Sequence, residues 1–92
     1  MAIDPSLIAK VEAALRSATR EGGDLAPSIQ LEEAAGRVAG HVLSDSFGAL
    51  WPSARQDLIW KHLDAALTPY ERTRISFIVT DTPDEHRVLT GS

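Results

Sequence analysis

Apolar residues recur at helical spacing near the start of the chain and predict an amphipathic helix over residues 5–20. The apolar stripe consists of Leu7, Ile8, Val11, Ala14, Leu15 and Ala18. Asp4 can cap this helix, and Pro5 takes the first helical position, where its missing N–H costs nothing. Gly22 and Gly23 end the helix, because glycine readily adopts the left-handed conformation that follows a helix C-terminus.

Two segments of alternating polarity come next, and residues 28–33 and 38–44 predict a β-hairpin. Residues 34–37 form the tight connection between these two strands. One face of the second strand carries Val38, Gly40 and Val42, and the other carries Ala39, His41 and Leu43. Residues 31–35 contain good helix formers, so a helical hairpin is the alternative structure for this region.

Turn-forming residues at 44–48 separate the hairpin from a second long helix, which starts at Pro52 or Ser53 and runs to about Leu67. Its expected buried stripe is Leu58, Ile59, Leu63, Ala66 and Leu67, with His62 lying within it. Ser53 and Gln56 have the spacing of a capping box. The helix ends at Thr68, because the following proline disfavours helical geometry at that residue.

Residues 74–80 are rich in β-branched and aromatic side chains and predict a third strand. Strict alternation places Ile75, Phe77 and Val79 on one face and Ser76, Ile78 and Thr80 on the other. A short last helix then begins, in which Thr82 caps, Pro83 takes the first position and Glu85 completes a reciprocal capping box. Val88 and Leu89 are expected to pack back on the sheet.

The predicted order is therefore α-β-β-α-β-α within one domain over residues 1–92. A three-stranded sheet needs a cover for its apolar face, and the two long helices can supply it. We expect an α+β fold of two layers, with the helices packed on one face of the sheet.

Composition narrows the function classes. The chain has no cysteine, which excludes a disulfide framework, a thiolate metal site and a cysteine nucleophile. A net charge of −4 disfavours nonspecific binding to nucleic acid, which requires a basic face. The first residues lack the pattern of a signal peptide, and no apolar stretch approaches the roughly 18 residues of a membrane span. We therefore expect a cytoplasmic protein that does not contact membranes.

Three stretches of the sequence resemble the BolA family. Residues 42–47 are similar to the family's strand ending in Val-Ser-Asp-x-Phe, and residues 55–63 are similar to its Arg-His-Arg-x-Ile-Tyr-x-x-Leu helix. Residues 74–85 are similar to the family's ending, His-Ala-Leu-x-Leu-x-x-x-Thr-Pro-Glu-Glu-Trp. The match runs in register from about Val38 to His86, with a small insertion near Tyr70 and Glu71.

This resemblance implies a KH-like sandwich and a role in binding a partner. BolA proteins bind monothiol glutaredoxins and share a bridging 2Fe–2S cluster with them, or assist its delivery in iron–sulfur metabolism. Some are also discussed as transcription regulators. The resemblance therefore predicts an accessory or regulatory protein that acts by docking a glutaredoxin-like partner, and it predicts no enzyme.

The chain departs from the family at the residues that carry its metal chemistry. Arg74 replaces the histidine that supplies an imidazole to the cluster, and a guanidinium has no lone pair to offer a metal. Residues 34–37 contain neither the Cys nor the His of the usual second ligand. His86 replaces the terminal Trp, and Gln56 and Asp57 replace the His-Arg pair of the face thought to meet DNA. We expect no cofactor in the isolated chain.

Candidate site residues follow from the family resemblance and from these departures. If any residue replaces the missing metal ligand, His86 is the candidate, while His62 is expected to be a hydrogen-bonded core residue. We expect no metal constellation, because the three histidines show no convergent spacing in the sequence. Phe47 and Trp51 are candidates for an anchor patch. The candidates for partner binding are Phe47, Trp51, Arg74, Asp81 and His86.

Two alternatives to partner docking remain open. A nucleic-acid-binding transcriptional regulator of KH-like fold is one, although the Gly-x-x-Gly loop of such domains is absent. A plain dimerisation or scaffold module is the other, and the chain is expected to be a monomer or a homodimer. No nucleophile–base pair can be assembled from the sequence, which argues against catalysis.

Overall fold

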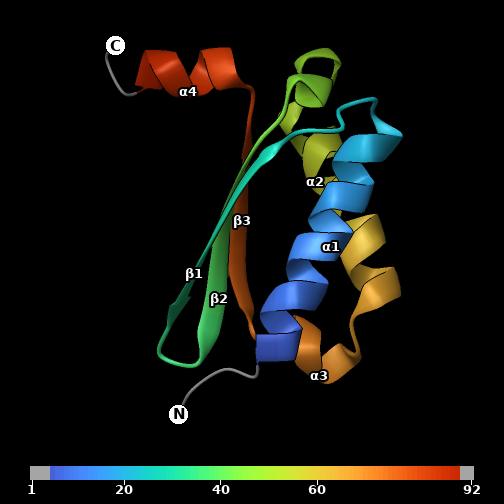
Figure 1. Cartoon of the computed structure of the whole chain (residues 1–92), viewed down its shortest axis with the longest axis vertical. Coiled ribbons are helices and arrows are strands. Elements are labelled where there is room, and N and C mark those ends of the chain that lie inside the picture. Colours follow the sequence, from blue (N-terminus) through green and yellow to red (C-terminus); the bar gives the residue numbers. More distant parts are fainter. Residues whose placement is uncertain (1–4, 90–92) are drawn as a thin grey trace.

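The computed structural model describes residues 5–89, with side chains as far as Val88, and has the predicted α+β architecture (Figure 1). The elements are α1 (Pro5–Glu21), β1 (Ser28–Ala34), β2 (Arg37–Leu43), the 3₁₀ helix η1 (Asp45–Ala49), α2 (Pro52–Ala66), α3 (Pro69–Arg72), β3 (Ile75–Asp81) and α4 (Pro83–Leu89). Within the described residues, no helix is long and apolar enough to cross a membrane. Asp4, the expected cap of α1, lies outside the described residues.

The three strands lie in the order β1-β2-β3, so β2 is central. β1 and β2 form the predicted antiparallel hairpin, whereas β3 pairs parallel to β2. Parallel pairing follows from the connection, because α2 carries the chain back along the sheet before β3 begins. α1 and α2 lie side by side over one face of the sheet, and α4 lies at the end where β3 finishes (Figure 1).

The turn of the hairpin explains why it forms a sheet and not a pair of helices. β1 and β2 are joined by two residues, Ala35 with φ of 54° and Gly36 with φ of 76°. Positive φ at both central positions is the signature of a type I′ turn, whose twist matches that of the flanking strands. The helical alternative for residues 31–35 is therefore wrong, because the chain reverses direction within those residues.

The hydrophobic core lies between the sheet and the two long helices. The buried apolar residues are Leu7, Val11, Ala14, Leu15, Ala18, Val38, Val42, Phe47, Ile59, Leu63, Leu67, Ile75 and Ile78. Gly40 lies in the middle of this face, where a Cβ would come within 2.8 Å of Leu31 Cδ2 and 2.9 Å of Ile78 Cδ1. The absence of a side chain at Gly40 therefore allows two neighbouring strands to place large residues against each other.

The predicted alternation of β3 is wrong after Ile75. Ile75, Ile78 and Thr80 are buried, whereas Phe77 and Val79 are exposed. The cause is a register shift, since Val38 pairs with Ile75 but the next residue of β2 pairs with Phe77. One extra residue in β3 reverses the alternation after Ile75, as a β-bulge does. Two apolar side chains are therefore left on the uncovered face of the sheet.

Some of the predicted helix details also differ. Trp51 is the N-cap of α2 without a side-chain hydrogen bond, so the expected Ser53–Gln56 box is absent, and Gln56 instead donates to the Ile78 carbonyl at 2.8 Å. His62 is hydrogen-bonded as expected, to Glu21 at 3.2 Å, but it is half-buried and not part of the core. Expected stripe residue Ala66 is exposed, and so is Val88 of α4, which does not pack on the sheet.

The short helix α3 was not predicted. It occupies the insertion near Tyr70 and has a complete capping box between Thr68 and Glu71. The proline at position 69 therefore ends one helix and begins the next.

Candidate functional site

The five partner-binding candidates do not form one patch. Phe47 is fully buried, so its expected role in a surface anchor is wrong. The 3₁₀ helix turns its ring into the core, where the Arg55 guanidinium lies 5.9 Å from the ring centre. Trp51 is 82% exposed, as expected of a loop residue.

Arg74 and Asp81 lie at opposite ends of β3. Arg74 donates from Nη2 to the Tyr70 hydroxyl at 2.7 Å, and its guanidinium stacks 5.1 Å from that ring. A strand advances about 3.3 Å per residue, so roughly 20 Å of chain separates Arg74 from Asp81. The two residues therefore cannot pair with each other.

Asp81 instead belongs to a cluster with two histidines at the end of the sheet. Asp81 is the last residue of β3, and His41 lies near the end of β2 on the same uncovered face. Parallel pairing brings the carboxyl ends of these two strands together, with Leu43 opposite Asp81. The chain then turns into α4, which returns His86 to the same point.

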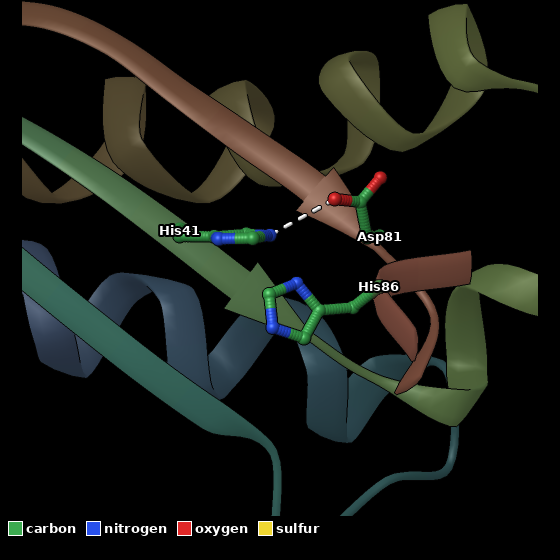
Figure 2. Close-up of side chains that lie close together, drawn as sticks. All are labelled: His41, Asp81 and His86. Atoms are coloured by element: carbon green, nitrogen blue, oxygen red, sulfur yellow. Dashed lines mark hydrogen bonds and ion pairs between the residues drawn. The ribbon is translucent and has the colours of Figure 1, made fainter. Parts of the chain in front are cut away.

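The geometry of this cluster is close (Figure 2). Nε2 of His41 lies 2.9 Å from Oδ2 of Asp81, and the rings of His41 and His86 meet edge to face with their centres 5.1 Å apart. One ligating atom from each of the three side chains lies within 4.8 Å of the other two. All three residues are half-buried, so they remain reachable from solvent.

α4 is oriented by contacts that are independent of the histidines. The predicted capping box is present, since the Thr82 N–H donates to Glu85 Oε1 at 2.9 Å and the Glu85 N–H donates to Thr82 Oγ1 at 3.1 Å. Arg55 donates to both carboxylate oxygens of Glu85, at 2.7 and 2.9 Å. The Arg55 hydrogen bond, followed by that from the Thr82 N–H, lowers the pKa of Glu85 from 4.5 to about 2.

Arg55 connects α4 to the rest of the domain. It is buried, and its Nε donates to the carbonyls of Phe47 and Leu50, both at 3.0 Å. Its Nη1 also donates to the Thr80 carbonyl of β3 at 3.3 Å. One guanidinium therefore ties η1, α2, β3 and α4 together at the end of the sheet that carries the histidine cluster.

A shallow groove on the uncovered face of the sheet leads up to the cluster. Its lining residues are Gln30, Glu32, Ala39, Gly40, His41, Phe77 and Val79. Phe77 is 57% exposed and Val79 is 39% exposed, and Val79 pairs directly with His41 across the strands. Apolar surface and possible metal ligands are thus continuous on one face of the domain.

Sequence reasoning did not bring His41, Asp81 and His86 together. His41 and Asp81 come from separate strands, and their proximity depends on the parallel pairing of β2 and β3. The crossover through α2 was the available signal, because a strand that returns after a helix on one face pairs parallel. His86 required in addition the direction of α4, which no local pattern gives.

Comparison with known proteins supports the fold. No protein-family model matches the sequence, and no curated protein is similar enough to match it. The crystal structure of a Bol-like protein from Babesia bovis is similar, with a TM-score of 0.55 over 89% of this chain and 91% of that chain, at 20% identity. Likeness at this identity concerns the fold, and it agrees with the three stretches that resemble the family. The chain therefore has the fold of BolA-like proteins.

Proposed function

We propose that this chain is a BolA-like accessory protein of the cytoplasm that acts by docking a protein partner, a monothiol glutaredoxin, and not by catalysis. The docking surface is the uncovered face of β3 together with the adjoining α4. Two features support the proposal: the BolA-like fold, and the family motifs that run in register from about Val38 to His86.

The observation that carries the docking surface is the exposure of Phe77 and Val79. Both are apolar, both lie on the face of the sheet opposite α1 and α2, and polar residues such as Gln30 and Glu32 border them in the groove. An exposed apolar patch with a polar rim is typical of a protein interaction site. A partner that covers this patch would bury one aromatic anchor, the kind of residue that dominates binding energy at interfaces.

The face of β3 is a better docking surface than its outer edge. The Ile78 carbonyl accepts a hydrogen bond from Gln56, and the Thr80 carbonyl accepts one from Arg55. These two acceptors are therefore not free to pair with an incoming strand, which is how an edge strand is commonly protected. A partner is expected to pack side chains against the sheet and not to extend it.

The residues present do not fit a cluster held at the family's position. Arg74 offers no lone pair to iron and is engaged with Tyr70, and the turn residues Ala35 and Gly36 supply no ligand. An iron–sulfur cluster is therefore not expected at this end of the sheet. The proposed complex forms through surface contact and does not require iron or sulfide.

A binding measurement with matched variants tests the proposal. The purified chain is titrated with a monothiol glutaredoxin by calorimetry, without iron or sulfide, and light scattering gives the stoichiometry. We expect a one-to-one complex whose affinity falls at least about tenfold in Phe77→Ser. Leu25→Ser is the matched control, because Leu25 is also apolar and exposed but lies outside the sheet, between α1 and β1.

Each outcome decides the question. A complex that is weakened by Phe77→Ser and unchanged by Leu25→Ser supports the proposal. Absence of binding by the parent chain, or equal binding by both variants, overturns it. A parent chain that forms only a homodimer through Phe77 would instead support the dimerisation module.

A further inference from the structure

We infer that His41, Asp81 and His86 bind a divalent transition-metal ion. The site is formed by the ends of β2 and β3 and by the first turns of α4 (Figure 2). This site lies at the opposite end of β3 from Arg74, which stands at the position of the family's metal ligand. The two positions are therefore different sites. The inference does not depend on the proposed docking function.

The donor set is chemically suited to such an ion. Two imidazoles and one carboxylate are ligands for Zn²⁺, Fe²⁺ and related ions, and three protein ligands leave a coordination position open for water or another ligand. The chain offers no thiolate, so the softer ions that require sulfur are disfavoured. A hard ion such as Mg²⁺ or Ca²⁺ is also disfavoured, because two of the three donors are nitrogen.

The distances allow an ion to enter with small movements. Tetrahedral coordination at Zn–N and Zn–O lengths of about 2.0–2.1 Å places neighbouring ligand atoms about 3.3 Å apart. Nε2 of His41 and Oδ2 of Asp81 are 2.9 Å apart, so these two must separate only slightly. All three ligating atoms already lie within 4.8 Å of one another, and rotation of the half-buried His86 side chain can supply the remaining approach.

The backbone around the site is fixed before any ion binds. The Asp81 carbonyl accepts a hydrogen bond from the Ser44 N–H at 3.0 Å, which joins the ends of the two strands. The Thr82–Glu85 capping box and the Arg55–Glu85 pair hold the first turn of α4, which carries His86. Binding therefore costs little ordering of the chain, and the ion would add a direct link between α4 and the sheet.

Metal titration of the untagged chain tests the inference, because a histidine tag would itself bind the ion. Zn²⁺ is titrated by calorimetry, and Co²⁺ is titrated while its visible absorption is recorded. We expect one ion per chain with micromolar or tighter affinity. His41→Ala, Asp81→Asn and His86→Gln should each weaken binding at least about tenfold, as expected when a ligand is lost.

The third histidine of the chain provides the control. His62 lies on α2 against Glu21, outside the cluster, so His62→Ala removes an imidazole and should leave the affinity unchanged. Thermal unfolding gives a second reading, since an ion that binds only the folded chain raises the midpoint. We expect this rise in the parent and in His62→Ala but not in His86→Gln.

Two results would overturn the inference. One is a parent chain that binds none of Zn²⁺, Co²⁺ or Fe²⁺ in the micromolar range. The other is binding whose affinity is unchanged in His86→Gln, whatever His62→Ala does. Circular dichroism verifies that each variant is folded, and if His41→Ala does not fold, His86→Gln decides the outcome. Because no partner is present, these results are independent of the glutaredoxin experiment.

Discussion

Replacing Arg55 should reveal how strongly one guanidinium holds the end of the sheet together. The side chain is only 7% exposed and donates to three backbone carbonyls as well as to Glu85. Arg55→Met keeps the apolar stem and removes every donor. The Phe47 carbonyl retains the hydrogen bond from the Leu50 N–H, so two carbonyls, those of Leu50 and Thr80, lose the donor that Arg55 provides.

These two carbonyls set the expected magnitude. A buried acceptor without a partner costs about 1–3 kcal/mol. The Thr80 contact is buried and the Leu50 contact is half-buried, so Arg55→Met should lower the free energy of unfolding by about 3 kcal/mol, toward the lower end for two acceptors. The ion pair adds only a small contribution to this figure, because the Glu85 side chain is 44% exposed and water screens its charge. For a domain of this size, the unfolding midpoint should fall by roughly 12–24 °C.

Urea denaturation followed by circular dichroism measures this change directly. Arg55→Lys is the informative companion, because an ammonium keeps the charge but cannot reach both carbonyls and the Glu85 carboxylate at once. We expect Arg55→Lys to lose most of the same stability. If Arg55→Met unfolded at the urea concentration of the parent, the buried network would contribute no net stability and the reasoning would be refuted.

The Arg55 hydrogen bond lowers the pKa of Glu85 from 4.5 to about 2 in the folded chain. The stability that ionised Glu85 contributes is therefore complete above pH 4.5 and is lost as the pH falls toward 2. Acid should consequently lower the thermal midpoint more in the parent than in Glu85→Gln. Ala35→Asn should raise the free energy of unfolding by about 0.5–1 kcal/mol in urea titrations, since asparagine tolerates positive φ better than alanine; a loss of stability would contradict the assigned turn. Phe47→Ala should lower the free energy of unfolding by about 3–5 kcal/mol, because the Phe47 ring is buried. Phe77→Ser should lower it by less than about 0.5 kcal/mol, because the Phe77 ring faces solvent. Equal losses of stability would contradict these two placements.

The features that the sequence predicted well are those decided by neighbours in the chain. The capping box of α4 formed as expected because Thr82 and Glu85 satisfy each other's backbone N–H groups locally. The hairpin formed at the expected residues because its strands adjoin a two-residue turn. In both cases, no distant segment is needed to complete the interaction.

The features that the sequence did not predict depend on residues far away in the chain. Alternation alone placed Phe77 on the same face as Ile75, but a bulge against β2 turned Phe77 to the uncovered face and buried Ile78 instead. The Ser53–Gln56 box did not form, because Gln56 bonds the Ile78 carbonyl of β3. The Gln56 side chain bonds this carbonyl in place of the local capping contact, because the carbonyl would otherwise lack a partner at the sheet edge.

The position of the histidine cluster follows from the sheet topology. Parallel strands β2 and β3 end together, so His41 and Asp81 meet there, and the chain must turn at that point to enter α4. The start of β3, where the family resemblance places a metal ligand, carries Arg74, whose charge repels a cation and whose side chain contacts Tyr70. Metal-binding capacity is therefore expected at the carboxyl end of β3 and not at its start. Because Phe77 and Val79 line the same groove as His41 on the uncovered face, a partner that docks there would lie beside the histidine cluster.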